Sequence, residues 1–163
     1  MVAEQGAVGF YSKLGIPRIM TGWSKFSSGT IGGDAENYAN AHGAKSATLE
    51  SGSHFEKRSN DVAYQSIVSL LSLLGMIAGT EQTAARPLEI VDVYAVVTKE
   101  ADDFRYAGKV DNFQFIEKGK SFGFQSGRAI TVSEDSYLLI PMKPEDTRIH
   151  EEVCYLGRKV DAA

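Results

Sequence analysis

The chain has 163 residues and a mass of 17.7 kDa, which suits one domain or two small ones and excludes a large multidomain protein. Hydrophobic residues make up 43% of it and charged residues 23%, a composition that supports a folded core and excludes a disordered chain. Because 17 basic residues stand against 21 acidic ones, the net charge is −4, and nucleic acid is not an expected partner.

Cysteine usage and hydropathy favour a cytoplasmic protein. Cys154 is the single cysteine, so the chain can form neither an internal disulfide nor a cysteine-rich metal site. The opening residues, Met-Val-Ala-Glu-Gln, lack the basic and apolar segments of a signal peptide. The longest apolar run, residues 67–78, is interrupted by serines and a glycine and is shorter than the roughly 20 residues of a membrane span. We therefore expect no membrane partner.

In chain order, the first predicted elements are two strands separated by a loop and a helix. Residues 15–22 and 45–50 predict short buried strands, because each apolar run is brief and ends in turn residues. Between them, residues 27–34 predict a glycine-rich loop and residues 35–41 a short helix.

The next predicted element is a longer helix that begins near Asp61 and is capped by Ser59 or Asn60. Its apolar residues recur at the 3.6-residue spacing of a helix that buries one face: Ala63, Ile67, Leu70, Leu71, Leu74 and Ala78. Strands alternate with helices up to this point, which predicts an α/β sheet with helices on its faces.

A polar segment that ends in a proline predicts a domain boundary. Residues 80–87 are expected to be a linker between an α/β domain at 1–79 and a β-domain at 88–163. After Pro87 the hydrophobic period changes to two, which predicts a small antiparallel barrel or sandwich. Its expected strands are residues 88–97, 112–116, 121–124, 129–132, 137–140 and 153–156.

Several short motifs resemble functional sites but lack residues that those sites need. Gly-Lys-Ser at 119–121 is not a phosphate-binding loop, because that loop needs a glycine where this chain has Gln114. His54-Phe-Glu56 has the form of a zinc deaminase motif, yet that site also needs a pair of cysteines. Neither these motifs nor His42 and His150 form a zinc-site pattern. Cys154 lies in an apolar strand and is interpreted as a buried hydrophobic residue.

One segment carries a family resemblance. Residues 47–52, Ala-Thr-Leu-Glu-Ser-Gly, are followed about ten residues later by Val62-Ala63 and by a helix that closes with Leu74-Gly-Met-Ile. This arrangement resembles the succinylglutamate desuccinylase/aspartoacylase family, zinc-carboxypeptidase-like enzymes whose catalytic glutamate lies in a similar strand-end motif. Residues 89–94, 115–119, 140–141 and 155–158 are similar to segments of the family's C-terminal β-domain, so the likeness extends from about residue 15 onward.

The resemblance implies that this chain corresponds to the C-terminal half of such an enzyme. In the family, a His-x-x-Glu pair and a second histidine hold zinc, and all three would precede Met1. We therefore expect either an excised piece or one partner of a split protein. Zinc is expected in the full-length enzyme, and no metal is expected in this chain alone.

The resemblance also implies site residues. Glu50 would be the catalytic residue, first as general base towards a zinc-bound water and then as general acid towards the leaving amine. The residues themselves agree, because an apolar strand that ends in a carboxylate predicts a position at the C-terminal edge of the sheet, where α/β ligand sites form. A solvated or capping glutamate is the alternative. Tyr155 is similar to a family tyrosine that reaches the substrate, and Tyr38 and Arg58 lie near the motif as further substrate-binding candidates. Where the family has a substrate-binding arginine, this chain has Asn40.

Two functions follow as hypotheses. The first is the C-terminal portion of a zinc-dependent amidohydrolase that cleaves N-acyl amino acids or a related small amide. The second is a non-catalytic split half or relic that binds a partner chain or a small carboxylate. Either would expose surface that the other half of the enzyme covers, so we also expect a homo-oligomer.

Overall fold

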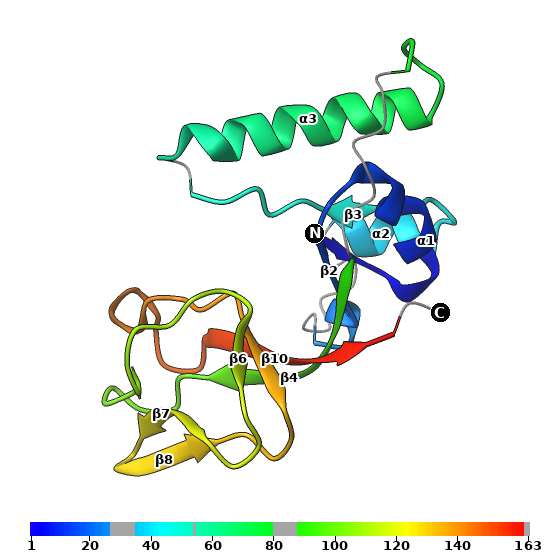
Figure 1. Cartoon of the computed structure of the whole chain (residues 1–163). Helices are drawn as coiled ribbons and strands as arrows, with labels where there is room; N and C mark the ends of the chain where they lie inside the picture. Colours follow the sequence, from blue (N-terminus) through cyan, green and yellow to red (C-terminus); the bar gives the residue numbers. More distant parts are fainter. Residues whose placement is uncertain (27–34, 54, 80–87, 162–163) are drawn as a thin grey trace. The chain divides into compact units, whose positions relative to one another are not determined.

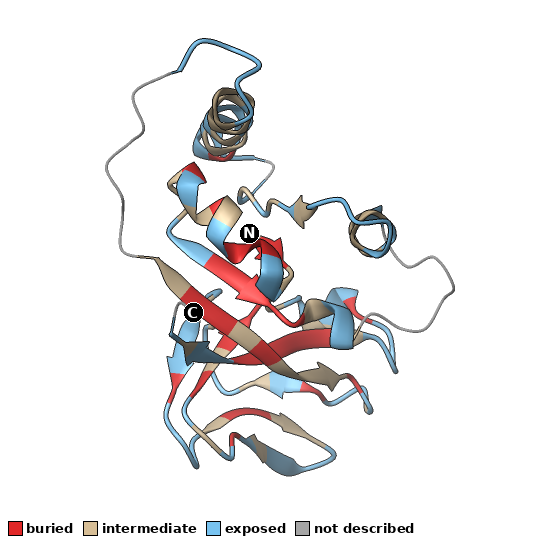
Figure 2. Cartoon of the chain, turned by 90° about the vertical axis from the view of Figure 1, so that its right-hand side faces the viewer, coloured by how far each residue is buried: buried red, intermediate tan, exposed pale blue. Residues whose placement is uncertain are grey.

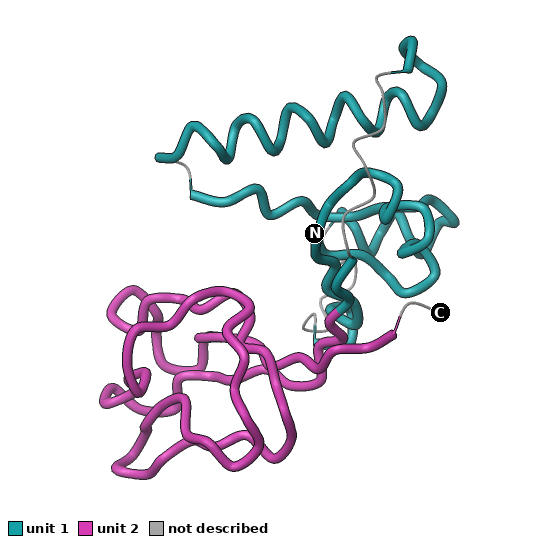
Figure 3. The backbone as a smooth tube through the Cα atoms, viewed as in Figure 1, with its two compact units in different colours: residues 1–90 teal, residues 91–163 magenta. Residues whose placement is uncertain are grey.

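The computed structural model describes residues 1–26, 35–53, 55–79 and 88–161. The chain divides into two compact units, residues 1–90 and 91–163, and each is described by itself (Figure 3). The expected linker at 80–87, the expected glycine-rich loop at 27–34 and His54 lie outside the described residues. The expected domain limits therefore stay a prediction.

The first unit is organised around β1 (Val2–Ala3), the central one of three short strands (Figure 1). It pairs in parallel with β2 (Arg18–Thr21), with Val2 opposite Met20, and antiparallel with β3 (Ala47–Thr48), with Val2 opposite Thr48. β2 and β3 confirm the two strands predicted in this half, although both are shorter than predicted. The predicted burial is wrong for β3, because Ala47 is only partly buried and Thr48 is exposed. β1 was not predicted, because two residues carry no periodicity.

Short helical turns follow β1 and supply much of this unit's core. They are η1 (Gln5–Ala7), α1 (Val8–Tyr11) and η2 (Ser12–Leu14), and they bury Ala7, Val8, Tyr11 and Leu14. Gly15 ends them at φ +70°, a left-handed conformation that favours glycine. A further turn, η3 (Trp23–Lys25), follows β2, and α2 (Ala35–Ala41) confirms the predicted short helix.

The long helix differs from the prediction at its start. α3 spans Lys57–Leu73, so it begins four residues before Asp61, and Ser59 lies inside it as its one buried residue. Glu56 occupies the N-cap without a side-chain cap hydrogen bond. The expected buried apolar face is also wrong, because Ile67 and Leu74 are exposed and Leu70 and Leu71 are only partly buried.

The second unit consists of antiparallel strands in two groups. β4 (Glu89–Thr98) begins at the end of the first unit, where the Glu89 N–H donates to the Pro17 carbonyl. The strand order continues as β4, β10 (Glu152–Val160), β9 (Ser136–Leu139) and β6 (Gln114–Ile116). A three-stranded sheet has the order β5 (Arg105–Tyr106), β7 (Ser121–Gln125) and β8 (Arg128–Thr131). The turn η4 (Pro144–Asp146) lies between β9 and β10.

Apolar side chains of the second unit form one core cluster: Phe104, Ile116, Phe122, Val132, Leu138, Val153, Cys154 and Leu156. Cys154 is fully buried, as predicted, and burial raises the pKa of its thiol to about 12. Such a thiol is inert at neutral pH.

The fold class is mixed α/β, and the antiparallel strands predicted for the second half are confirmed. Neither sheet of the described residues closes on itself, so the predicted barrel is not confirmed. Among the helices that the structure describes, none is long and apolar enough to cross a membrane.

Candidate functional site

Glu50 follows β3 by two residues, and its side chain is exposed. Because β3 runs antiparallel to β1, and β1 runs parallel to β2, the end of β3 lies beside the beginnings of the other two strands. The expectation of a shared carboxyl edge is therefore wrong, since that rule holds for neighbouring strands that run in the same direction. Glu50 instead shares its edge of the sheet with the first residues of β1 and β2.

Met1 and Arg18 are the neighbours that this arrangement brings to the edge. The Met1 nitrogen donates a hydrogen bond of 3.2 Å to the Arg18 carbonyl oxygen. Burial lowers the pKa of the Met1 amino group and the Glu50 carboxylate opposes that shift, which places Glu50 within electrostatic reach of it. The Arg18 guanidinium pairs with the Glu89 carboxylate at 3.0 Å. Sequence reasoning missed Arg18, because no motif marks it.

Helix α2 holds the strand that leads to Glu50. The Thr48 hydroxyl donates to the Glu36 carboxylate at 2.7 Å, and the Ser46 hydroxyl donates to the Glu36 backbone carbonyl at 2.8 Å. Glu36, in the first turn of α2, therefore accepts hydrogen bonds from the residue before β3 and from its last residue. It is a positioning residue that sequence reasoning also missed, since an acidic residue in a first helical turn is common for other reasons.

The segment after Glu50 is held against the start of α3. Gly52 has φ +120°, and a Cβ built on it would lie 2.7 Å from the Ser59 hydroxyl oxygen. The Glu56 N–H donates to the Ser53 carbonyl, and the Ser59 N–H donates to the Glu56 carbonyl. The glycine of the Thr-Leu-Glu-Ser-Gly motif thus permits both the turn and the close approach of the helix.

Replacing Gly52 with alanine should lower the free energy of unfolding by about 1–3 kcal/mol, because the new Cβ adds backbone strain and displaces Ser59. Urea unfolding of the purified chain measures this. Gly43→Ala is the matched control, since Gly43 also has a positive φ, +82°, but no atom lies within 4 Å of its added Cβ. If both variants lost the same free energy of unfolding, the backbone strain at positive φ would explain the whole effect, and the close approach of Ser59 would be contradicted.

The other residues predicted for the first unit lie on the two helices that hold the Glu50 segment. Tyr38 is on α2, exposed, and its ring stacks on His42 at a centroid distance of 4.1 Å. Arg58 is on the first turn of α3, also exposed, beside the buried Ser59. Asn40 has a buried side-chain nitrogen that makes no hydrogen bond to the residues that the structure describes.

Tyr155 belongs to β10 of the second unit and is buried. Its hydroxyl donates to the Glu152 carboxylate at 2.6 Å. Burial is the larger cause of the raised pKa of this phenol, and the neighbouring Glu152 carboxylate is the smaller one. Its predicted contact with substrate stays a prediction.

The described residues do not form a zinc site. Among them, no group of three or more His, Cys, Asp or Glu side chains lies close enough together to hold a metal ion.

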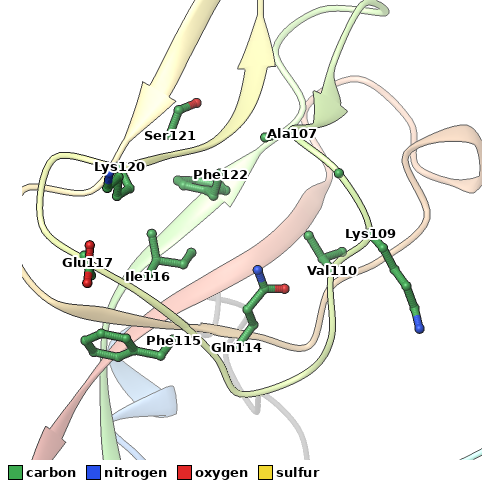
Figure 4. A pocket seen from close by; sticks show the side chains of 11 residues that line it. Ala107, Lys109, Val110, Gln114, Phe115, Ile116, Glu117, Lys120, Ser121 and Phe122 are labelled. Carbon is green, nitrogen blue, oxygen red and sulfur yellow. The ribbon is translucent and has the colours of Figure 1, made fainter.

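The second unit contains a pocket of about 490 Å³ (Figure 4). Val110, Ile116 and Phe122 give it apolar walls, and Gln114, Glu117 and Lys120 give it polar ones. None of the residues predicted from the sequence lines this pocket. A second pocket of about 410 Å³ includes Lys99, whose ammonium group donates to the carbonyls of Pro144 and Thr147.

Comparison with known proteins supports the resemblance through structure alone. No family model matches the sequence, and no curated protein matches it. A solved structure from Vibrio parahaemolyticus, named as a succinylglutamate desuccinylase, matches with a TM-score of 0.65 and 13% identity. A succinylglutamate desuccinylase/aspartoacylase from Rhodobacter sphaeroides matches with a TM-score of 0.66 and 14% identity. The chain has the fold of succinylglutamate desuccinylase/aspartoacylase proteins.

The extent of the match also agrees with the sequence analysis. The alignments cover 98% of this chain but 48% of the V. parahaemolyticus protein and 53% of the R. sphaeroides protein. A desuccinylase from Vibrio cholerae gives the same result, with a TM-score of 0.62, 15% identity and 46% of its chain covered. This chain thus spans about half the length of the structures that it matches, as expected for one half of such a protein.

Proposed function

We propose that this chain is the C-terminal portion of a zinc-dependent amidohydrolase that cleaves N-acyl amino acids or a related small amide. The observation that carries the proposal is the fold match, which extends over 98% of the chain to proteins named as succinylglutamate desuccinylases. The position of Glu50 supports it, because the carboxylate is exposed on a segment that contacts on both sides hold in place.

Glu50 is the proposed general base. Its carboxylate accepts a proton from the water that attacks the amide carbonyl, and then donates that proton to the nitrogen as the C–N bond breaks. Both transfers need a carboxylate that faces solvent and substrate while its backbone stays fixed. The Thr48–Glu36 hydrogen bond and the Gly52–Ser59 contact supply the fixed backbone.

Substrate recognition is assigned to groups around this segment. The exposed Arg58 guanidinium suits the carboxylate of an amino acid. Tyr38 remains a candidate hydroxyl donor to the substrate. An acylated amino acid offers acceptors to both residues.

The metal ligands of the proposed enzyme would come from polypeptide beyond these 163 residues. We expect the chain alone to bind zinc weakly or not at all, because three correctly placed ligands are needed for tight binding. Metal analysis after dialysis against zinc checks this. One tightly held zinc per chain would contradict it.

The proposal is tested on the native protein from its source cells. Its intact mass should exceed 17.7 kDa or be accompanied by a second chain, and it should hydrolyse N-acyl amino acids in a manner that a chelator abolishes. A native protein of 17.7 kDa, without a partner and without hydrolysis, would favour the non-catalytic alternative and overturn the proposal.

A further inference from the structure

Lys99 is a buried cation in the second unit. The buried residues of this unit lie mainly in its strands, and the segments between the strands are mostly exposed (Figure 2). Lys99 comes directly after β4, in such a segment, yet it is only 8% exposed. Its backbone is fixed on both sides, because the Lys99 N–H donates to the Glu151 carbonyl and the His150 N–H donates to the Lys99 carbonyl. The side chain is therefore held away from bulk solvent.

The contacts of the Lys99 ammonium group do not balance its charge. An ammonium group has three N–H donors, and two of these donate to the carbonyl oxygens of Pro144, at 3.0 Å, and Thr147, at 2.9 Å. Among the described residues, no carboxylate forms an ion pair with this group, and the third N–H has no acceptor. A lysine is rarely buried without a counter-ion, because an uncompensated buried charge is costly. An anionic partner would therefore stabilise this side chain.

The Lys99 side chain lines the pocket of about 410 Å³, which lies within the size range of small-molecule sites, about 300–1,000 Å³. Every residue that lines this pocket belongs to the second unit. The buried Phe104 ring and the partly buried Tyr106 ring give the pocket an apolar part, and they meet edge to face at a centroid distance of 5.3 Å. The buried ammonium group thus adjoins a space of the size and polarity that suit a small organic ligand.

The other charged groups of the pocket indicate the class of ligand. Asp102 and Glu145 also line it, both are exposed, and within the described residues neither carboxylate makes a hydrogen bond or an ion pair. Arg105 also lines the pocket, and its guanidinium lies 4.7 Å from the centre of the Phe124 ring, which is not part of the lining. The two carboxylates would repel a multiply charged anion such as phosphate. A single acidic side chain would neutralise Lys99 and leave both carboxylates without a cation, whereas a zwitterion satisfies both kinds of group.

We propose that this pocket binds a free α-amino acid with an apolar side chain, and that Lys99 holds its carboxylate. The third N–H of Lys99 donates to the carboxylate of the amino acid. Asp102 and Glu145 attract its ammonium group, and the rings of Phe104 and Tyr106 contact its side chain. The inference rests on residues of the second unit alone and does not depend on the proposed enzymatic function.

Titration of the isotope-labelled 163-residue chain with L-leucine, followed by the amide chemical shifts in NMR, tests the site. Saturable shifts are expected within residues 99–108 and 144–147. Two analogues of leucine separate its charges, because isocaproate lacks the ammonium group and isoamylamine lacks the carboxylate. Each analogue should bind about tenfold or more weakly than leucine, since each loses one charge-assisted contact.

Variants of the two exposed carboxylates test the assignment without disturbing the fold. Glu145→Gln and Asp102→Asn should each weaken leucine binding by about twofold to fivefold, the range of an exposed ion pair, and the double variant by more. Glu117→Gln is the matched control, because Glu117 is an exposed carboxylate of the same unit that does not line this pocket. It should bind leucine like the wild type.

Lys99→Met tests the buried cation, since methionine keeps most of the side-chain length and removes the charge. Saturable binding of leucine should be lost. The variant also loses the hydrogen bonds to Pro144 and Thr147, so circular dichroism must show that it stays folded. If it unfolds, the carboxylate variants and the two leucine analogues still decide the question.

Three results would overturn the proposal. One is the absence of saturable leucine binding to the wild-type chain. The second is equal binding of isocaproate and leucine, which would mean that Lys99 accepts any carboxylate, including an acidic side chain of a longer polypeptide. The third is leucine binding that the variants of Asp102, Glu145 and a folded Lys99→Met leave unchanged.

Discussion

Replacing Glu50 with glutamine should lower the kcat of the complete, zinc-loaded enzyme by about 10²–10⁴-fold. Glutamine keeps the size and most of the hydrogen-bonding shape of the side chain but cannot accept the proton of the attacking water. KM should change little, because the exposed Glu50 side chain is assigned to proton transfer and not to binding. Steady-state kinetics on the wild type and the variant measure both quantities.

Two further measurements make this prediction specific to a general base. Zinc content should match the wild type, and a loss of zinc together with activity would mean that Glu50 coordinates metal. Glu56→Gln is the control, since Glu56 is an exposed carboxylate six residues further along the chain, at the N-cap of α3. It should keep activity within a few-fold of the wild type. If Glu50→Gln also kept its activity within a few-fold of the wild type, Glu50 would not be the general base.

Replacing Gly157 with alanine should give the largest loss of stability of the substitutions proposed for this protein, about 3 kcal/mol. Gly157 is buried on β10, and a Cβ there would lie 2.5 Å from Val91 Cγ1, 2.8 Å from Leu139 Cδ1 and 3.2 Å from the Asp92 carbonyl oxygen. Carbon atoms normally stay about 3.5–4.0 Å apart, so both neighbouring strands would have to move. Urea unfolding measures the change.

Gly108→Ala is the matched control in the same unit, because an added Cβ there meets no atom within 4 Å. Its free energy of unfolding should stay close to that of the wild type. Removing part of the obstacle with Val91→Ala should make the Gly157→Ala substitution less costly than it is alone. Equal stabilities of Gly157→Ala and Gly108→Ala would contradict the close packing of β10 against its neighbours.

The strands of the second unit could be predicted from the sequence because each carries its own local signal. Alternating apolar residues and flanking glycines or prolines identified β4, β7, β8, β9 and β10 within a few residues of their observed bounds. β5 was missed, since Arg105–Tyr106 is too short for any period. How these strands are ordered depends on pairs such as Tyr155 with Leu139, which are distant in sequence.

The candidate site was predictable only in part for the same reason. The sequence alone determined that Glu50 follows a short strand, is followed by a glycine and precedes a long helix. The tertiary structure decided what surrounds it. Pairing of β3 with β1 set the antiparallel direction that brings Glu50 beside Met1 and the start of β2.

Helix α3 shows most clearly which properties the local sequence does not determine. Its period of 3.6 residues determined that residues 63–73 are helical and amphipathic, because that property depends on neighbours three and four residues away. Its start at Lys57 and the exposure of its apolar face were decided by tertiary structure, through the contact of Ser59 with Gly52 and the limited contact with η2. Periodicity specifies that a face is apolar, but only the rest of the fold, or a second chain, determines what covers it.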